Sequence, residues 1–198
     1  MVMLKKINSE IKVSVIIPVW NPGPGITRCI ESLRNQTLTD IEMIFVDDCG
    51  TDGSMDKVRD AALEDSRIRI LENKKNIGAG ASRNRGINLA KGAYLSFVDS
   101  DDWIDNNFLE LLFIESKKKP LDIIKGQKIT IKSDENYKKN SKMNQLIRNS
   151  LTSGEPLYTS FVLEHFTAIY LRKFVKEKNI CYSSSPIGED STFFVESL

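Results

Sequence analysis

The sequence predicts an α/β fold in which a mostly parallel central sheet carries helices on both of its faces. Two observations lead to this prediction. Short apolar runs rich in β-branched residues alternate with segments of helical spacing, and this alternation is typical of βαβ units with right-handed crossovers. The chain of 198 residues is also long enough for one domain with a real core. We therefore expect residues 1–198 to form one domain.

Four apolar runs in the first half of the chain are expected to be strands. They are Val13 to Pro18, Ile41 to Val46, Ile68 to Leu71 and Ala93 to Val98. Continuous apolar runs of this length are typical of strands that are buried on both faces of a parallel sheet.

Helices are expected between these strands. They are predicted over 26–36, from 52–54 to about Glu64, and over 79–90, where Gly92 follows. In the first of them one face carries Ile26, Cys29, Ile30 and Leu33. A further helix is expected to start between Trp103 and Phe108.

The pattern is looser after Phe113. We expect a strand within 121–131, a loop at 132–144, a helical segment at 145–151, a short strand or turn bordered by 161–170 and 174–178, and a last helix at 191–197. Because the sequence stops inside that helix, we expect the chain to be truncated at its C-terminus.

Composition excludes several classes of protein. A net charge of +1 gives no general attraction to nucleic acid. The three cysteines are far apart in the sequence, which favours reduced thiols in a cytoplasmic protein over disulfides or a zinc site. With His165 as the single histidine, a histidine-based hydrolase lacks support. No apolar run approaches the ~20 residues of a transmembrane helix, although a peripheral membrane association remains open.

The densest group of acidic residues directly follows the fourth predicted strand. Asp99, Asp101 and Asp102 fall within four residues, and carboxylates this close repel one another unless a cation lies among them. Mg²⁺ or Mn²⁺ often binds through one or two carboxylates together with the phosphates of a substrate. These residues by themselves leave a second interpretation open, which is a solvated acidic turn that caps the next helix.

Three of the predicted strands end in turn-forming or acidic residues, at 18–21, at Asp47-Asp48 and at 99–102. In open α/β sheets, ligands bind outside the carboxyl ends of the strands. Two other motifs are weaker. Residues 78–83 lack the third glycine of a dinucleotide-binding fingerprint, and residues 48–59 lack the final glutamate of a calcium-binding loop.

Five motifs occur together in one order. They are Val13 to Asn21, Val46 to Ser54, Asn76 to Gly86, Asp99 to Asp102 and Gly188 to Asp190. In this combination the chain resembles glycosyltransferase family 2, whose members are inverting enzymes with the GT-A fold. The resemblance implies a Rossmann-like nucleotide-sugar-binding half over about 13–102 and an acceptor-side half over about 103–198.

The resemblance also implies roles for individual residues. Trp20 is expected to stack on the nucleobase, Asp48 to accept the imide N–H of uracil, and Arg83 to approach the diphosphate. The implied nucleotide-binding residues are Pro18, Trp20, Asn21, Asp48, Arg83, Asn84 and Asp99. The implied ligands of the divalent metal, Mn²⁺ or Mg²⁺, are Asp101, Asp99 and Asp102.

The implied catalytic base is Asp190, because an acceptor hydroxyl must lose its proton as it attacks the sugar. Glu189 is the rival for this role and is otherwise expected to orient Asp190 or to bind the acceptor. A helix N-terminus, where acidic residues suit the helix dipole, is the alternative for this motif.

The function implied by the resemblance is metal-dependent, inverting transfer of a sugar from a nucleotide donor, UDP-linked in our interpretation, to an acceptor hydroxyl. The expected acceptor is a glycan or lipid-linked glycan of surface polysaccharide synthesis, at the cytoplasmic face of the membrane. One alternative is a nucleotide-binding module without catalytic activity. Another is a sugar-nucleotide pyrophosphorylase, which needs a glycine-rich loop with a basic residue after the first strand, and residues 20–24 do not supply one.

Overall fold

The computed structural model describes residues 11–118, 122–126 and 167–183. Within them lies a six-stranded sheet in the order β3-β2-β1-β4-β6-β5. The strands are β1 (Val13–Val19), β2 (Ile41–Asp47), β3 (Ile68–Glu72), β4 (Tyr94–Phe97), β5 (Ile123–Lys125) and β6 (Ala168–Leu171). Pairing is parallel from β3 through β2 and β1 to β4, and antiparallel where β6 meets β4 and β5. The predicted mostly parallel sheet is confirmed.

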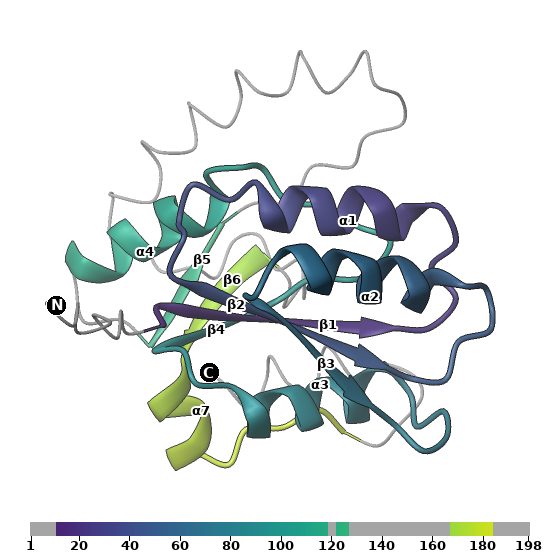
Figure 1. Ribbon diagram of the computed structural model, residues 1–198. Coiled ribbons are helices and arrows are strands. Elements are labelled where there is room, and N and C mark those ends of the chain that lie inside the picture. The colour runs from purple at the N-terminus through teal and green to yellow at the C-terminus, as the bar shows by residue number, and fades with distance from the viewer. Residues whose placement is uncertain (1–10, 119–121, 127–166, 184–198) are drawn as a thin grey trace, which may run out of the picture.

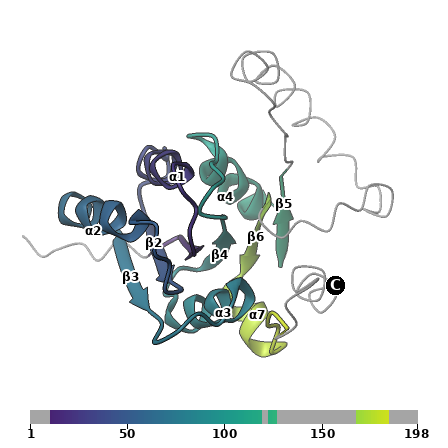
Figure 2. The ribbon, with the colours of Figure 1, turned by 90° about the vertical axis from the view of Figure 1, so that its right-hand side faces the viewer.

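Helices cover both faces of this sheet. They are α1 (Gly25–Arg34), α2 (Ser54–Glu64), α3 (Ala79–Leu89), α4 (Phe108–Lys118) and α7 (Arg172–Glu177). In Figures 1 and 2, α1, α2 and α4 lie on one face, and α3 and α7 lie on the other. This arrangement confirms the predicted α/β fold with helices on both faces.

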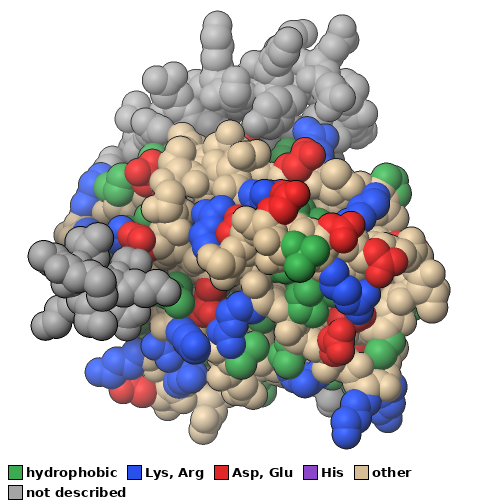
Figure 3. Space-filling model, viewed as in Figure 1, with side chains coloured by type: hydrophobic (Ala, Val, Ile, Leu, Met, Phe, Trp, Pro, Cys, Tyr) green, Lys and Arg blue, Asp and Glu red, His purple; other side chains and the backbone are tan. Residues whose placement is uncertain are grey.

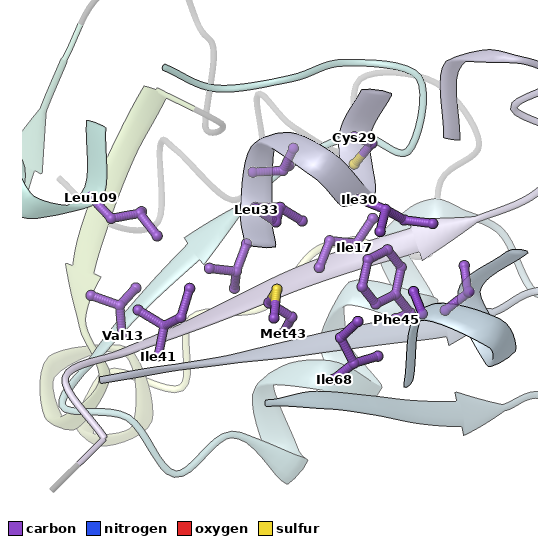
Figure 4. Packing of buried hydrophobic residues seen from close by; sticks show 14 of the residues in the cluster. Val13, Ile17, Cys29, Ile30, Leu33, Ile41, Met43, Phe45, Ile68 and Leu109 are labelled. Carbon is purple, nitrogen blue, oxygen red and sulfur yellow. The ribbon is translucent and has the colours of Figure 1, made fainter. Parts of the chain in front are cut away.

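The hydrophobic core has two parts because side chains along β1 alternate between the faces. Val15 and Ile17 belong to the cluster under α1 and α2, whereas Ile16 belongs to the cluster over α3. Figure 4 shows Ile30 and Leu33 of α1 pointing toward the sheet in the first of these clusters. The helical face predicted for α1 is therefore the face that packs on the sheet.

The structure differs from the expectations mainly after β4. Helix α4 begins at Phe108, the last residue of the predicted range, because the backbone before it forms hydrogen bonds with Ser32 of α1 and with Gln36 and Thr37, which follow α1. Strand β5 covers three residues of the range 121–131, and α7 begins at Arg172. The expected loop at 132–144 and helical segments at 145–151 and 191–197 lie outside the described residues.

On the face shown in Figure 3, acidic and basic side chains of the described residues lie interspersed over the helices. Such mixing agrees with the small net charge of +1. None of the helices in the described part of the chain has the length and apolar character needed to cross a bilayer.

Candidate functional site

The candidate site lies at the edge of the sheet where the parallel strands end. The carboxyl ends of β3, β2, β1 and β4 share this edge, because neighbouring strands pair in parallel. Four loops leave it, at 20–24, 48–53, 73–78 and 98–107. The predicted donor-binding residues that the structure describes lie on these loops, at the end of β1 or on α3, which follows the third loop.

The loop after β1 presents Trp20, whose side chain is 59% exposed although it is large and aromatic. The next residue, Asn21, has a positive φ of 50° and accepts a hydrogen bond from the backbone N–H of Thr51 at 2.6 Å. Gly23 donates its N–H to the carboxylate of Asp52 at 2.7 Å. These hydrogen bonds join the loop after β1 to the loop after β2, and they therefore hold the backbone that carries Trp20.

Asp48 follows β2 and is buried, with 1% of its surface exposed. One carboxylate oxygen accepts the side-chain N–H of Asn73 at 2.7 Å and the backbone N–H of Ile77 at 2.8 Å. The other accepts the backbone N–H of Gly78 at 2.9 Å. Gly78 has a φ of 86°, a conformation that favours glycine. Asp48 therefore holds the residues that lead into α3.

Asn73 is a member of this network that the sequence analysis missed. Its side-chain amide also donates to Ser82 of α3 at 2.9 Å, and its backbone N–H donates to the carbonyl of Asp47 at 2.9 Å. Arg85 in turn donates to its side-chain oxygen. The available signal was a polar residue directly after the third strand, the one strand end that the sequence analysis did not consider.

Arg83 of α3 reaches across to the loop after β4. Its guanidinium donates to the carboxylate of Asp99 at 2.7 Å and lies 5.1 Å from the ring centroid of Tyr182. The side chain of Arg83 is 4% exposed, whereas that of Asp99 is 31% exposed. This ion pair places a cation and a partly accessible carboxylate side by side at the edge of the sheet.

Asn84 fastens the end of the described chain to α3. Its side-chain N–H donates to the carbonyl of Tyr182 at 2.9 Å, and its side-chain oxygen accepts the N–H of the same residue at 2.9 Å. Asn84 was predicted to bind nucleotide. In this structure both polar atoms of its amide hold the backbone beside Arg83, a contact that the sequence did not reveal.

The acidic loop (residues 98–107) holds the three predicted metal ligands. The pKa of the Cys29 thiol is raised, first by burial and then by the negative charges of Asp99, Asp102 and Asp101. All three carboxylates are therefore near enough to this residue of α1 to affect it. Asp101 is exposed, and Asp99 and Asp102 are half-buried. Within the described residues no group of three His, Cys, Asp or Glu side chains is arranged to hold a metal ion.

This donor set nevertheless fits a hard divalent cation. Mg²⁺ and Mn²⁺ prefer oxygen ligands, and one or two carboxylates with the phosphates of a substrate suffice to bind Mg²⁺. Exposed Asp101 is accessible for such binding, whereas the Asp99 carboxylate already accepts a hydrogen bond from Arg83.

The structure adds little about the remaining predicted residues. Pro18 is buried in β1 opposite Val46 of β2. The predicted base Asp190, its neighbour Glu189, and His165 lie outside the described residues.

Comparison with known proteins decides the family. The model of the family described as "Glycosyl transferase family 2" matches residues 14–178. The chain belongs to glycosyltransferase family 2. Its motifs at 13–21, 46–54, 76–86 and 99–102 all fall in or at the border of the matched region.

Among curated relatives, the glycosyltransferase GlyG of Streptococcus pneumoniae is 37% identical over 114 residues, covering 58% of this chain and 38% of GlyG. A poly(ribitol-phosphate) beta-glucosyltransferase of Bacillus spizizenii is 40% identical over 119 residues, covering 59% of this chain and 19% of that protein. The chain thus spans well under half the length of these relatives.

Solved structures show the same fold. Residues 1–349 of S. aureus TarS in complex with UDP-GlcNAc match with a TM-score of 0.74 and 24% identity, covering 94% of this chain and 53% of TarS. The mannosyltransferase PcManGT from Pyrobaculum calidifontis, in complex with GDP-Man and Mn²⁺, matches with a TM-score of 0.65 and 17% identity, covering 91% and 50%. At these identities the likeness establishes the GT-A fold of this family 2 chain.

Proposed function

We propose that this chain forms a catalytic domain of an inverting, metal-dependent glycosyltransferase that moves a sugar from a UDP-sugar to an acceptor hydroxyl. One observation carries the proposal. Four features lie together at one edge of the sheet, on the loops or at the start of α3: an exposed aromatic ring, a buried carboxylate network, an arginine–aspartate pair and an exposed carboxylate. Family membership and the UDP-GlcNAc complex of TarS support it.

In this proposal the nucleotide lies across the ends of β1 and β2. Trp20 stacks on the base, since its exposed ring offers a face that any base can use. Asp48 accepts the imide N–H of uracil with the acceptor capacity that its three internal donors leave, because a carboxylate offers about four lone-pair sites. The carbonyl of Pro18 and the side chain of Asn21 complete the contacts.

The diphosphate lies beside Arg83 and the first turn of α3. Backbone N–H groups at the start of a helix attract anions, and the guanidinium adds a full charge. Asp101 and Asp102 would hold a divalent metal, Mn²⁺ or Mg²⁺, and Asp99 would bind the ribose or a water on that metal. When bound, the metal would supply positive charge that stabilises the diphosphate as a leaving group.

Asp190 removes the proton of the acceptor hydroxyl, with Glu189 as supporting or rival base. A single displacement from the face opposite the leaving group inverts the anomeric centre. Asn84 supports this half of the site by holding Tyr182, which precedes Asp190 in the chain by eight residues.

The acceptor that we propose is a glycan or lipid-linked glycan of a surface polysaccharide, reached from the cytoplasmic side of the membrane. The bacterial relatives support this choice, one of which is named for glucosyl transfer to poly(ribitol-phosphate). No nucleic acid partner is proposed, in keeping with the net charge of +1.

Titration calorimetry with UDP, GDP and dTDP, each with Mn²⁺ and with a chelator, tests the donor class. We expect UDP to bind more tightly than GDP and its affinity to rise with Mn²⁺. Tighter binding of GDP would overturn the choice of UDP, and no binding of any nucleotide would overturn the proposed site.

The Asp190→Asn variant tests catalysis separately. It should keep the UDP affinity of the wild type while losing sugar transfer, because the amide cannot accept the proton. Retained transfer would move the role of base to Glu189 or another group. UDP binding by the wild type without transfer to any acceptor would favour a nucleotide-binding module.

A further inference from the structure

Helix α1 follows the Trp20 loop directly, and one of its sides runs along the acidic loop (residues 98–107). The contacts come from α1 positions 25, 28, 29 and 32, which recur every three to four residues. In a helix that spacing places side chains on one face. A single face of α1 therefore meets the loop that carries the proposed metal ligands.

Backbone groups of the acidic loop depend on this face for their hydrogen bonds. The thiol of Cys29 lies 3.6 Å from the carbonyl of Asp99, and the hydroxyl of Ser32 accepts the N–H of Ile104 at 3.3 Å. Just after α1, the amide of Gln36 donates to the carbonyl of Asp105 at 2.8 Å. Without these partners, the same backbone groups of the loop would form hydrogen bonds with water. The path of the loop therefore follows α1.

A stacked pair anchors the middle of the contact. The guanidinium carbon of Arg28 lies 3.4 Å from the ring centroid of Trp103. Trp103 directly follows Asp102, and Arg28 is exposed on α1. A planar guanidinium stacks on an aromatic face in a way that a lysine ammonium does not. This stack holds the loop immediately after its carboxylates.

The first residue of α1 makes the closest approach. A Cβ atom at Gly25 would lie 2.9 Å from the Cα atom of Asp101 and 3.2 Å from its carbonyl oxygen. Because both are backbone atoms, the acidic loop itself would have to shift to admit a methyl group. Gly25 directly follows the loop that carries Trp20 (residues 20–24), so the contact joins the proposed base-binding loop to the proposed metal-binding loop.

We propose that α1 is the element that positions the metal-binding carboxylates, through the stack of Arg28 on Trp103 and the contact of Gly25 with Asp101. Arg28, Trp103 and Gly25 are positioning residues, since none of them is required to touch the metal or the nucleotide. The inference rests on the proposed function and adds how its metal site is built. If α1 has this role, substitutions on α1 should change how much Mn²⁺ raises the affinity for UDP.

The test compares the dissociation constant for UDP with Mn²⁺ and with a chelator in four chains. These are the wild type, Arg28→Ala, Gly25→Ala and the control Arg34→Ala, which removes the same charge at the far end of α1, where Arg34 pairs with Glu64. Arg28→Ala should reduce the Mn²⁺-dependent gain by about two- to fivefold and leave metal-free binding unchanged. Gly25→Ala should reduce it further, and the control should match the wild type.

Arg28→Lys separates charge from stacking. If the flat stack positions the loop, lysine restores only part of the lost gain, and full restoration would reduce the role of Arg28 to charge. Equal losses with and without Mn²⁺, or an Arg28→Ala variant that behaves like Arg34→Ala, would overturn the inference. Failure of the wild type to bind UDP would instead overturn the proposed function beneath it.

Discussion

Two buried carboxylates lie at opposite ends of β2. Glu42 lies near the start of the strand and is 3% exposed, and Asp48 follows its end and is 1% exposed. Both accept backbone N–H groups from the chain before or after α3, Lys91 for Glu42 and Gly78 for Asp48. The same strand therefore fastens both ends of α3.

The two networks differ in charge and in surroundings. Glu42 is paired with a cation, since Arg69 donates to it at 2.6 Å, and Ser14 donates at 2.6 Å. Asp48 instead accepts hydrogen bonds from a side-chain amide and two backbone N–H groups, all of which are neutral. Asp48 also lies at the edge where Trp20 is exposed. We infer that Glu42 serves stability alone, whereas Asp48 joins stability to ligand binding.

The largest effect on stability is expected for Glu42→Ala. It leaves Arg69 and the Lys91 N–H without their buried acceptor, so the free energy of unfolding should fall by about 3 kcal/mol in a urea titration. UDP affinity of the folded protein should not change. Glu64→Ala is the control, because its ion pair with Arg34 is on the surface and should contribute less than about 1 kcal/mol. Equal losses in the two variants would contradict the comparison.

Asp48→Ala should affect binding. Loss of an acceptor from the buried network is expected to weaken UDP binding by about 1–3 kcal/mol, roughly 5- to 150-fold in Kd. Calorimetry with pyrophosphate should show a smaller loss, because pyrophosphate has no base. Equal loss for the two ligands would mean that Asp48 acts only by holding the start of α3.

Lowering the pH should weaken the contribution of the Glu42 network to the free energy of unfolding. Burial by itself raises the pKa of Glu42, but hydrogen bonds from Ser14, the Lys91 N–H and Arg69 outweigh it and lower the pKa below its usual value. A lowered folded-state pKa contributes stability above the unfolded value of about 4.3 and loses it as the pH falls through the folded value. The wild type should therefore exceed Glu42→Gln in unfolding free energy at pH 7, and the gap should narrow below about pH 4. If urea titrations give the same difference in unfolding free energy between the two proteins at both pH values, the link between Glu42 ionisation and stability is refuted.

The smallest effect is expected for Asp52→Asn. Asp52 is exposed, and its carboxylate joins Gly23 to Ser54, whose backbone N–H groups lower its pKa. Weakening this link between the first two loops should reduce UDP affinity about two- to fivefold, with little change in stability. Asp56→Asn, at an exposed position in the first turn of α2, is the control. The same affinity in both variants would show that the link is not needed for binding.

Much of the fold could be predicted because its signals are local. The apolar run at 13–18 and the helical face of Ile26, Cys29, Ile30 and Leu33 appear in the structure nearly as predicted. The strands are rich in β-branched residues because both faces of the sheet are covered by helices. The start of α4 was harder to predict, because the residues before it form hydrogen bonds with Ser32 of α1 and with Gln36 just after that helix, far away in the sequence.

The candidate site could be predicted in location but not in its connections. Carboxylates and an aromatic at strand ends indicated the edge of the sheet, because parallel strands end together. The partner of each side chain was not visible in the sequence. Asn84 binds Tyr182 across 98 residues, and Asn73 joins Asp48 to Ser82.

The sequence by itself determined the order of strands and helices, the family motifs and the edge at which polar residues gather, because these depend on local patterns and chain direction. The tertiary structure alone decided that Asp48 is buried among three donors, that Arg83 pairs with Asp99, and that α1 lies along the acidic loop. The physical reason is that hydrogen bonds and close contacts depend on distances in space, which residues far apart in the chain acquire only when the sheet has formed.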